Sequence, residues 1–211
     1  MGVKPILFNT EMVQAILEGR KSVTRRVVKP QPEARPVPMS KDSCWPGYFA
    51  IQGTEKVIRP PYQTDDILWV RETWNCLPIP EPLRGTSKAY WYKADGAAPE
   101  DKWRSPYHMP REAARIFLRV TGVRVERLKE ITFQQAMAEG QPRCTGSITI
   151  CGGFASCLSC EGSIGNARQW FSEVWNSTIK PADLPAYGWA ANPWVWVIGF
   201  ERISKCGEVA E

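Results

Sequence analysis

The sequence predicts an α+β domain built around a mixed, barrel-like sheet. About six strand patterns and three helix patterns follow one another along the 211 residues, and the strands do not alternate strictly with helices. This order disfavours a doubly wound sheet, in which strands and helices take turns. Long stretches rich in proline, glycine and charge separate the patterns. Loops of this length are uncommon in compact domains and are often functional.

The chain begins with a strand, a helix and a second strand. Residues 6–8 form a short apolar run, and Asn9 or Thr10 can cap the helix that follows. Gly19 supplies the stop signal at the end of that helix. From 22 to 28 the polar residues recur at every second position, which is typical of a strand. The stretch directly after Gly19 is therefore expected to be a turn between helix and strand.

The rest of the chain predicts a long excursion followed by further regular elements. Prolines break the pattern from 29 to 62, where only a short hairpin near 49–58 is expected. The remaining strands are expected at 67–72, 89–94, 115–128 (with a bulge at Gly122) and 194–203, and the remaining helices at 132–139 and 166–176.

Composition indicates a globular domain of mildly basic charge. Hydrophobic residues make up 43% of the chain and charged residues 23%. The 27 Lys and Arg residues exceed the 22 Asp and Glu residues, which permits a nucleotide or nucleic-acid partner but gives no long basic stripe. No stretch approaches the ~20 apolar residues of a membrane span, and the first eight residues lack the features of a signal peptide. We therefore expect a cytoplasmic protein without a membrane partner.

The octapeptide from Gly19 to Arg26 concentrates reactive side chains. A lysine three positions before a threonine can supply a base and a nucleophile if the backbone turns between them. The Thr24 hydroxyl is inert alone, and Lys21 can serve as a base only if its pKa falls well below ~10.4. The same cluster can instead bind a phosphate. It can also lie on an exposed strand edge, where its polar side chains contact water and have no functional role.

Several segments, in order, resemble conserved blocks of the ASCH domain family, in a larger branch found in phages and prophages. The first is Gly19-x-Lys21-x-x-Thr24-x-Arg26 at the junction of helix and strand. The others are residues 67–74 (Ile-Leu-Trp-Val-Arg-Glu-Thr-Trp), 108–111 (His-Met-Pro-Arg) and 192–198 (Asn-Pro-Trp-Val-Trp-Val-Ile). The resemblance implies a β-barrel like that of the RNA-binding PUA domains, with flanking helices. It also implies one domain over 1–204, with insertions at about 31–62 and 140–165 and a tail at 205–211.

The threonine at position 24 is similar to members that hydrolyse N4-acylated cytidines such as N4-acetylcytidine. In those members a lysine, a threonine and a glutamate form the catalytic set, which maps onto Lys21, Thr24 and Glu139. In those members the glutamate lies on a short helix after the long central strand. The resemblance identifies this helix more readily than the residue on it, so Glu130 is a competing candidate. The resemblance thus implies an amidohydrolase in which Lys21 acts as base and the glutamate orients the lysine or delivers a proton. Whether Thr24 attacks directly or activates a water stays open.

Six further residues are candidates for substrate binding. Arg26 shares a strand face with Thr24 and could bind the acyl oxygen or a cytosine carbonyl, and Arg20 adds positive charge. Glu72, at the end of the strand over 67–72, could accept a hydrogen bond from a cytosine amino group or pair with Arg71. The lone histidine and a strand tryptophan could line a pocket or be structural. These last four residues are Trp69, Arg71, Glu72 and His108.

Four of the seven cysteines fall in one glycine-rich stretch. Cys157 and Cys160 have the spacing of a zinc knuckle, and four thiolates would satisfy tetrahedral zinc. Cys144 and Cys151 are separated by six residues, which is not knuckle spacing. The alternatives are a structural zinc site and free thiols. No cofactor is expected for catalysis.

Two other functions compete with hydrolysis of a nucleoside amide. A barrel like that of PUA domains would also suit a non-catalytic module that binds RNA or a modified nucleotide. A ribonuclease, with the basic cluster holding phosphate, is the third alternative. The threonine in place of the acid that many ASCH domains carry at position 24 favours the enzyme.

Overall fold

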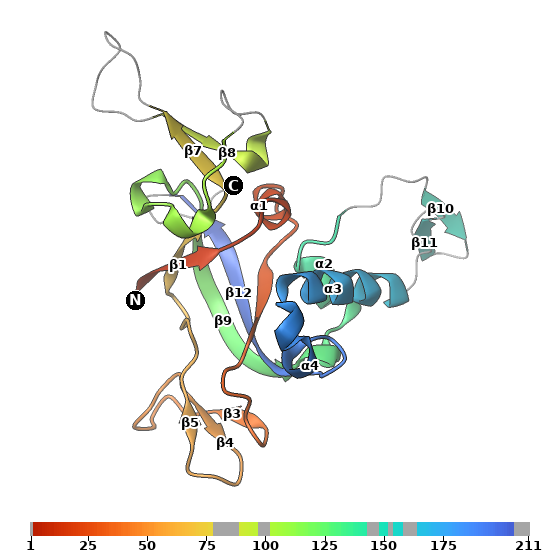
Figure 1. Cartoon of the computed structure of the whole chain (residues 1–211). Helices are drawn as coiled ribbons and strands as arrows, with labels where there is room; N and C mark the ends of the chain where they lie inside the picture. The colour runs from red at the N-terminus through yellow and green to blue at the C-terminus, as the bar shows by residue number, and fades with distance from the viewer. Residues whose placement is uncertain are drawn as a thin grey trace.

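The structure is a computed structural model that describes residues 2–77, 89–96, 102–142, 148–151, 154–157 and 164–204. The chain has a mixed α+β fold (Figure 1), which confirms the predicted class. Its helices are α1 (Thr10–Leu17), α2 (Phe133–Ala138), α3 (Ile164–Thr178) and α4 (Leu184–Tyr187). Short 3-10 turns are η1 (Lys93–Asp95), η2 (Pro106–His108), η3 (Arg111–Ala113), η4 (Leu128–Glu130) and η5 (Pro181–Asp183).

A five-stranded sheet forms the centre of the fold. In spatial order its strands are β1 (Val3–Leu7), β6 (Ile67–Arg71), β9 (Phe117–Arg127), β12 (Trp194–Ile203) and β2 (Val23–Val27). Strands β1 and β6 are parallel, and the other neighbours are antiparallel. Strand β2 therefore lies at one edge of the sheet and β1 at the other.

The central sheet curls so that its two edge strands approach each other. Arg26 of β2 donates a hydrogen bond of 2.8 Å from Nη2 to the carbonyl of Leu7, the last residue of β1. Among the described residues no backbone ladder joins β1 to β2, so these strands do not close a barrel. The long strands bend where the register of β9 against β12 shifts, between Gly199 and Phe200, opposite Thr121 and Gly122. This shift confirms the predicted irregularity at Gly122.

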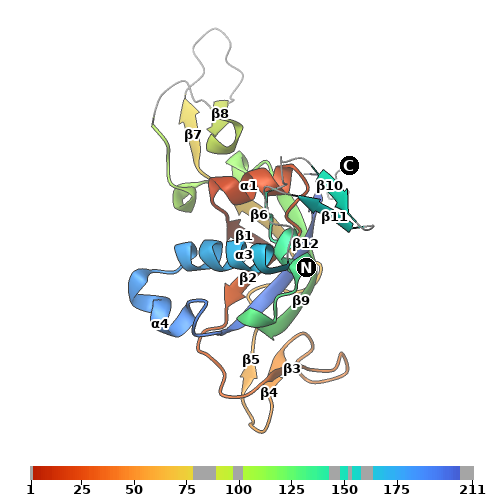
Figure 2. The same cartoon turned by 90° about the vertical axis from the view of Figure 1, so that its right-hand side faces the viewer.

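Smaller sheets extend from the two ends of the central sheet (Figures 1 and 2). Strands β3 (Pro36–Pro38), β4 (Phe49–Ile51) and β5 (Val57–Ile58) form a sheet at one end. The β7 (Trp74–Leu77) and β8 (Ala89–Tyr92) hairpin projects from the other end, near α1. Strands β10 (Ile148–Cys151) and β11 (Phe154–Cys157) pair with each other, apart from the central sheet.

Hydrophobic residues pack on both faces of the central sheet. Strand β12 divides between the two cores, because Trp196 and Ile198 join the cluster beneath α1 whereas Val195 and Val197 join the cluster beneath α2 and α3. In Figure 2, α1 lies above α3 and β2 lies below it. Among the described residues, no helix is long and apolar enough to cross a membrane.

Several short elements were not predicted by the sequence pattern, among them β10 and β11 in the stretch 140–165. Strand β3 carries prolines at two of its three positions, and it pairs only with β4. Such an edge position tolerates the missing N–H donor. Strand β7 follows β6 after two residues, so that the two patterns merge in the sequence. Helix α4 has only four residues, which is too short for the helical spacing of apolar residues to be recognised in the sequence.

Candidate active site

The end of helix α2 positions a glutamate directly beside the start of strand β2. Thr132 caps α2 by accepting a hydrogen bond from the Gln135 amide, and Glu139 is the C-terminal cap. The amide of Ser22 donates to the carbonyl of Ala138 at 2.9 Å, and Lys21 and Glu139 face each other as an antiparallel bridge. The helix end thus extends the sheet by one residue pair, just where β2 begins.

Lys21, Arg25 and Glu139 form a buried charge network. The Lys21 ammonium donates to Oε2 of Glu139 at 2.7 Å and to the Glu139 carbonyl at 2.8 Å. Nη1 of Arg25 donates to the second carboxylate oxygen at 2.9 Å. The three residues are 4–5% exposed. Two cations therefore share one carboxylate that is almost completely removed from water, which fixes the position of the lysine.

Further contacts lock Arg25 in place. Its Nη2 donates to the side-chain carbonyl of Gln135 at 2.8 Å and to Glu126 at 3.3 Å. The guanidinium also lies 5.6 Å from the centre of the Phe171 ring. Gln135 belongs to the capping box of α2, so a residue that stabilises the start of the helix also orients the arginine that holds Glu139.

Burial makes Lys21 the titratable cation of this network. Desolvation lowers the pKa of the Lys21 ammonium, with smaller contributions from Arg25 and Arg26, whereas the carboxylate of Glu139 acts in the opposite direction. Arginine keeps its proton at any accessible pH. Of the two cations on Glu139, only Lys21 can therefore lose a proton and act as a base.

Thr24 lies on the β2 face that is turned toward α1. It pairs in register with Ile198 of β12 and is 4% exposed. Among the described residues, none makes a hydrogen bond to the Thr24 hydroxyl, which borders a cavity together with Lys21 and Glu139. The hydroxyl is thus available to a molecule that enters this cavity.

This cavity, which we call the edge cavity, lies beside the unpaired edge of β2 and has a volume of about 110 Å³. Because β2 is an edge strand, side chains from both of its faces reach the cavity. The charged and hydroxyl groups of Lys21, Thr24 and Glu139 form one part of its lining. The rest is mostly apolar and aromatic, with Phe8 and Met12 on one side and Trp170, Phe171, Val174 and Trp175 of α3 on the other.

The structure brings the three predicted catalytic residues and Arg26 to the edge cavity. Glu139, rather than Glu130, is the carboxylate that contacts Lys21. Glu130 is exposed and accepts a hydrogen bond from the Arg127 amide within a capping turn. Arg26 lies with its guanidinium 5.4 Å from the Phe8 ring centre, on the same strand face as Thr24 as predicted.

Arg20 does not line the edge cavity. Its guanidinium donates to the Glu18 carboxylate at 2.6 Å and to the Gly140 carbonyl at 2.6 Å. Its role in the structure is to tie the end of α1 to the segment that follows α2.

The four predicted binding residues from the other blocks also lie outside the edge cavity. Glu72 is 1% exposed and pairs with Arg115 through both carboxylate oxygens, at 2.9 and 3.0 Å, rather than with Arg71. Trp69 belongs to a separate core cluster, and Arg71 stacks on its ring at 4.6 Å. His108 is exposed on η2. Trp69 and Arg71 belong to β6, which β9 and β12 separate from β2 in the sheet.

The zinc prediction is not tested. Cys144 and Cys160 lie outside the described residues, and only the backbone is described at Cys151 and Cys157.

The aromatic wall from α3 was not predicted as part of the site. The helical spacing of Trp170, Phe171, Val174 and Trp175 indicates an apolar face, but it does not say what that face covers. Arg25, which the strand alternation places on the face opposite Thr24, was predicted only to add positive charge near Lys21 and not to hold the glutamate. It contributes by holding Glu139 from behind β2.

Comparison with protein-family models, with curated proteins and with solved structures finds no match for this chain. The fold and the edge cavity therefore define an α+β protein with a buried lysine–glutamate–arginine network, and the resemblance to ASCH domains stays a prediction.

Gly140 is expected to be essential for the geometry of this site. Its φ angle is +102°, and a methyl group there would lie 2.8 Å from Cβ of Ala15 and 3.2 Å from Cβ of Lys21. We expect Gly140→Ala to lower the free energy of unfolding by about 2 to 4 kcal/mol, through backbone strain and overpacking. Urea denaturation measures this loss.

Gly53→Ala is the matched control for Gly140→Ala. Gly53 has a φ of +75° but nothing within 4 Å of the added methyl group, so only backbone strain of about 1 to 2 kcal/mol applies. Equal losses in the two variants would contradict the close approach of Gly140 to Lys21.

Proposed function

We propose that this protein is an amidohydrolase that cleaves the N4-acyl amide of N4-acetylcytidine or a related N4-acylcytidine, on a barrel-like sheet of the ASCH type. The observation that carries the proposal is a buried lysine, held by a carboxylate, that lines the same cavity as a threonine hydroxyl without a partner among the described residues. The aromatic lining of the edge cavity suits a planar pyrimidine. The sequence resemblance supplies the substrate class.

In the proposed reaction, neutral Lys21 takes the proton of the Thr24 hydroxyl as its oxygen attacks the acetyl carbon. The oxyanion that forms lies near the guanidinium of Arg26. The carbon–nitrogen bond then breaks, and the Lys21 ammonium returns its proton to N4, which releases cytidine. Water attacks the acetyl ester on Thr24, Lys21 again accepts a proton, and acetate leaves as the threonine is restored. Glu139 keeps the lysine oriented throughout.

Incubation of the purified protein with N4-acetylcytidine tests the proposal directly. Release of cytidine can be followed by the change in ultraviolet absorbance and verified by chromatography. The Lys21→Ala variant separates hydrolysis at this site from a contaminating activity. A wild-type protein that releases no cytidine would reject the proposal for this substrate.

The rate should increase with pH over the range in which Lys21 loses its proton. Burial holds the pKa of Lys21 below the ordinary value of 10.5, and only the neutral amine can accept a proton. We therefore expect kcat/KM to rise with pH and to level off at an apparent pKa below 10.5. A profile measured from about pH 5 to about pH 10, corrected for spontaneous hydrolysis, checks this. A profile that falls over this interval would contradict a lysine base.

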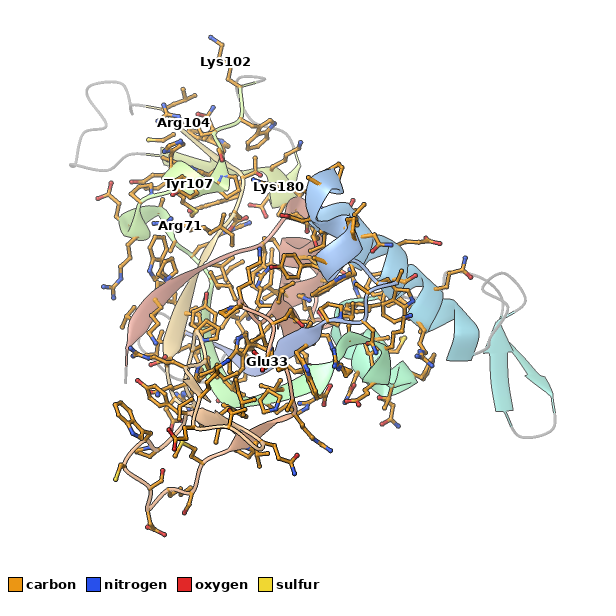
Figure 3. The ribbon with its side chains drawn as sticks, turned by 60° about the horizontal axis from the view of Figure 1, so that its bottom comes forward. Glu33, Arg71, Lys102, Arg104, Tyr107 and Lys180 are labelled. Atoms are coloured by element: carbon orange, nitrogen blue, oxygen red, sulfur yellow. The ribbon has the colours of Figure 1, made fainter. Side chains whose placement is uncertain are left out.

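RNA binding is a second candidate function, favoured by a basic and aromatic surface around β7 and η2. Tyr107 is 69% exposed there, and Arg71 donates to its carbonyl at 3.2 Å (Figure 3). Arg104 lies 5.3 Å from the ring centre of Trp74, which is only 5% exposed, so Tyr107 rather than Trp74 offers its ring to a base. Aromatic rings interleaved with cations bind single-stranded nucleic acid. Filter binding of RNA across a salt series, with Arg104→Ala as the variant, distinguishes this function from hydrolysis.

A further inference from the structure

A second hollow opens beside the edge cavity, and Arg26 lines both of them. This hollow, which we call the basic pocket, has a volume of about 400 Å³. Its lining includes Arg26, Lys29, Arg59, Tyr62 and Trp196. Arg26 thus borders both spaces.

The basic pocket carries positive charge that the described part of the chain does not neutralise. Three cations line it, and no carboxylate does so among the described residues. Arg26, Lys29 and Arg59 form no ion pair with any described residue. The carboxylate of Asp66, four residues after Tyr62, pairs instead with the Lys4 ammonium at 2.6 Å. A pocket with this charge attracts an anion.

Neutral groups hold the three cations in position. The Lys29 ammonium lies 4.4 Å from the centre of the Tyr187 ring, and the Arg59 guanidinium lies 5.8 Å from that of Tyr48. Arg26 donates to a backbone carbonyl. Its pKa is lowered by burial, so its charge gains from a counter-ion. These contacts orient the cations without cancelling their charge.

We infer that the basic pocket binds a phosphate ester of the substrate, so that the preferred substrate is a phosphorylated N4-acylcytidine rather than the free nucleoside. The inference rests on the proposed function and extends it. Guanidinium groups bind phosphate oxygens in pairs, and an ammonium adds a point charge. The edge cavity would hold the acylated base beside Thr24, while the ribose and phosphate lie toward Lys29 and Arg59.

The segment that provides much of the basic pocket is the one that the sequence marks as an insertion. Arg59, Pro61 and Tyr62 all belong to the stretch 31–62, which falls outside the pattern of the resembling family. In this proposal, the insertion selects a substrate that carries an anionic group.

Direct binding of the reaction products tests the phosphate site without requiring catalysis. Dissociation constants of cytidine and cytidine 5′-monophosphate are measured by calorimetry on the wild-type protein and on Lys29→Ala/Arg59→Ala. We expect the monophosphate to bind at least about tenfold more tightly than cytidine, and the double variant to lose that difference. Equal affinities in the wild-type protein would overturn the inference.

The matched control removes two cations at the opposite end of the molecule. Lys93 and Lys102 are exposed and line neither space, and Figure 3 shows Lys102 far from the labelled Glu33 at the other end. The Lys93→Ala/Lys102→Ala variant should keep the preference for the monophosphate. An equal loss in both double variants would show that net charge alone is responsible, and would overturn the site.

Hydrolysis assays then locate the phosphate. The substrates are N4-acetylcytidine, its 5′- and 3′-monophosphates, and a short oligoribonucleotide that contains the acetylated base. Lys29→Ala/Arg59→Ala should lower kcat/KM at least about tenfold for the favoured phosphorylated form and leave the nucleoside unchanged. The form that responds identifies a free nucleotide or a strand as the source, and no response in any form overturns the inference. If no substrate is cleaved, the proposed function fails, and product binding still decides the phosphate site.

Discussion

Thr24→Val will lower kcat for N4-acetylcytidine by about 10³-fold or more, while the protein stays folded. Valine has nearly the shape of threonine, and the hydroxyl that it lacks makes no hydrogen bond with the described residues. The substitution therefore removes the nucleophile without leaving a buried group unpaired. Steady-state kinetics measure the loss, and urea denaturation should show a change of about 1 kcal/mol or less.

Thr24→Ser is the matched control for Thr24→Val. It keeps a hydroxyl at the same carbon atom and should retain a measurable fraction of the wild-type kcat. If Thr24→Val keeps most of its activity, Thr24 is not the nucleophile. A large loss of kcat in both variants would instead point to the γ-methyl group and its packing.

The local patterns of the chain were sufficient to predict most elements around the site. Asn9 caps α1 and Gly19 has a φ of +71° at its end, as the sequence indicated. Strand β12 runs from Trp194 to Ile203, over the same residues as its apolar pattern. These features depend on residues that are close together in the chain, so they can be predicted from one sequence alone.

Contacts between segments that are far apart in the sequence could not be predicted from local patterns. The pairing of Lys21 with Glu139 joins residues 118 positions apart, and the family resemblance rather than any periodicity suggested it. Glu72 illustrates the limit, because the sequence offered Arg71 as its partner while the fold supplies Arg115. A carboxylate at the end of a strand pairs with whichever cation the neighbouring strand brings to it, and the order of strands decides that.

The buried network also predicts that Glu139 is the most sensitive residue of the site for stability. Glu139→Gln leaves Lys21 without a counter-charge, and Arg25 with only the more distant Glu126, in a region that is 4–5% exposed. We expect the free energy of unfolding to fall by about 3 to 5 kcal/mol at neutral pH, as for other buried pairs that lose one partner. Urea denaturation at several pH values measures the loss.

The pH dependence of Glu139→Gln separates an electrostatic role from a packing role. The carboxylate raises the pKa of Lys21 against the effect of burial, so its removal should lower that pKa further. The folded variant then binds fewer protons than its unfolded chain over a wider range. Its stability should therefore rise with pH up to the ordinary lysine value of 10.5, beginning at a lower pH and with a larger total gain than in the wild-type protein. Residual hydrolysis should level off at a lower pH.

Glu126→Gln provides the comparison that makes this expectation decisive. Glu126 also contacts Arg25, at 3.3 Å, but its side chain is 18% exposed against 5% for Glu139. Water compensates much of its loss, so we expect about 1 kcal/mol or less. If both variants are destabilised equally, the two carboxylates are equally solvated and Glu139 does not hold Lys21 in a dry site. A proton transfer from Thr24 to Lys21 at neutral pH would then lack its physical basis, because a solvated lysine keeps its proton.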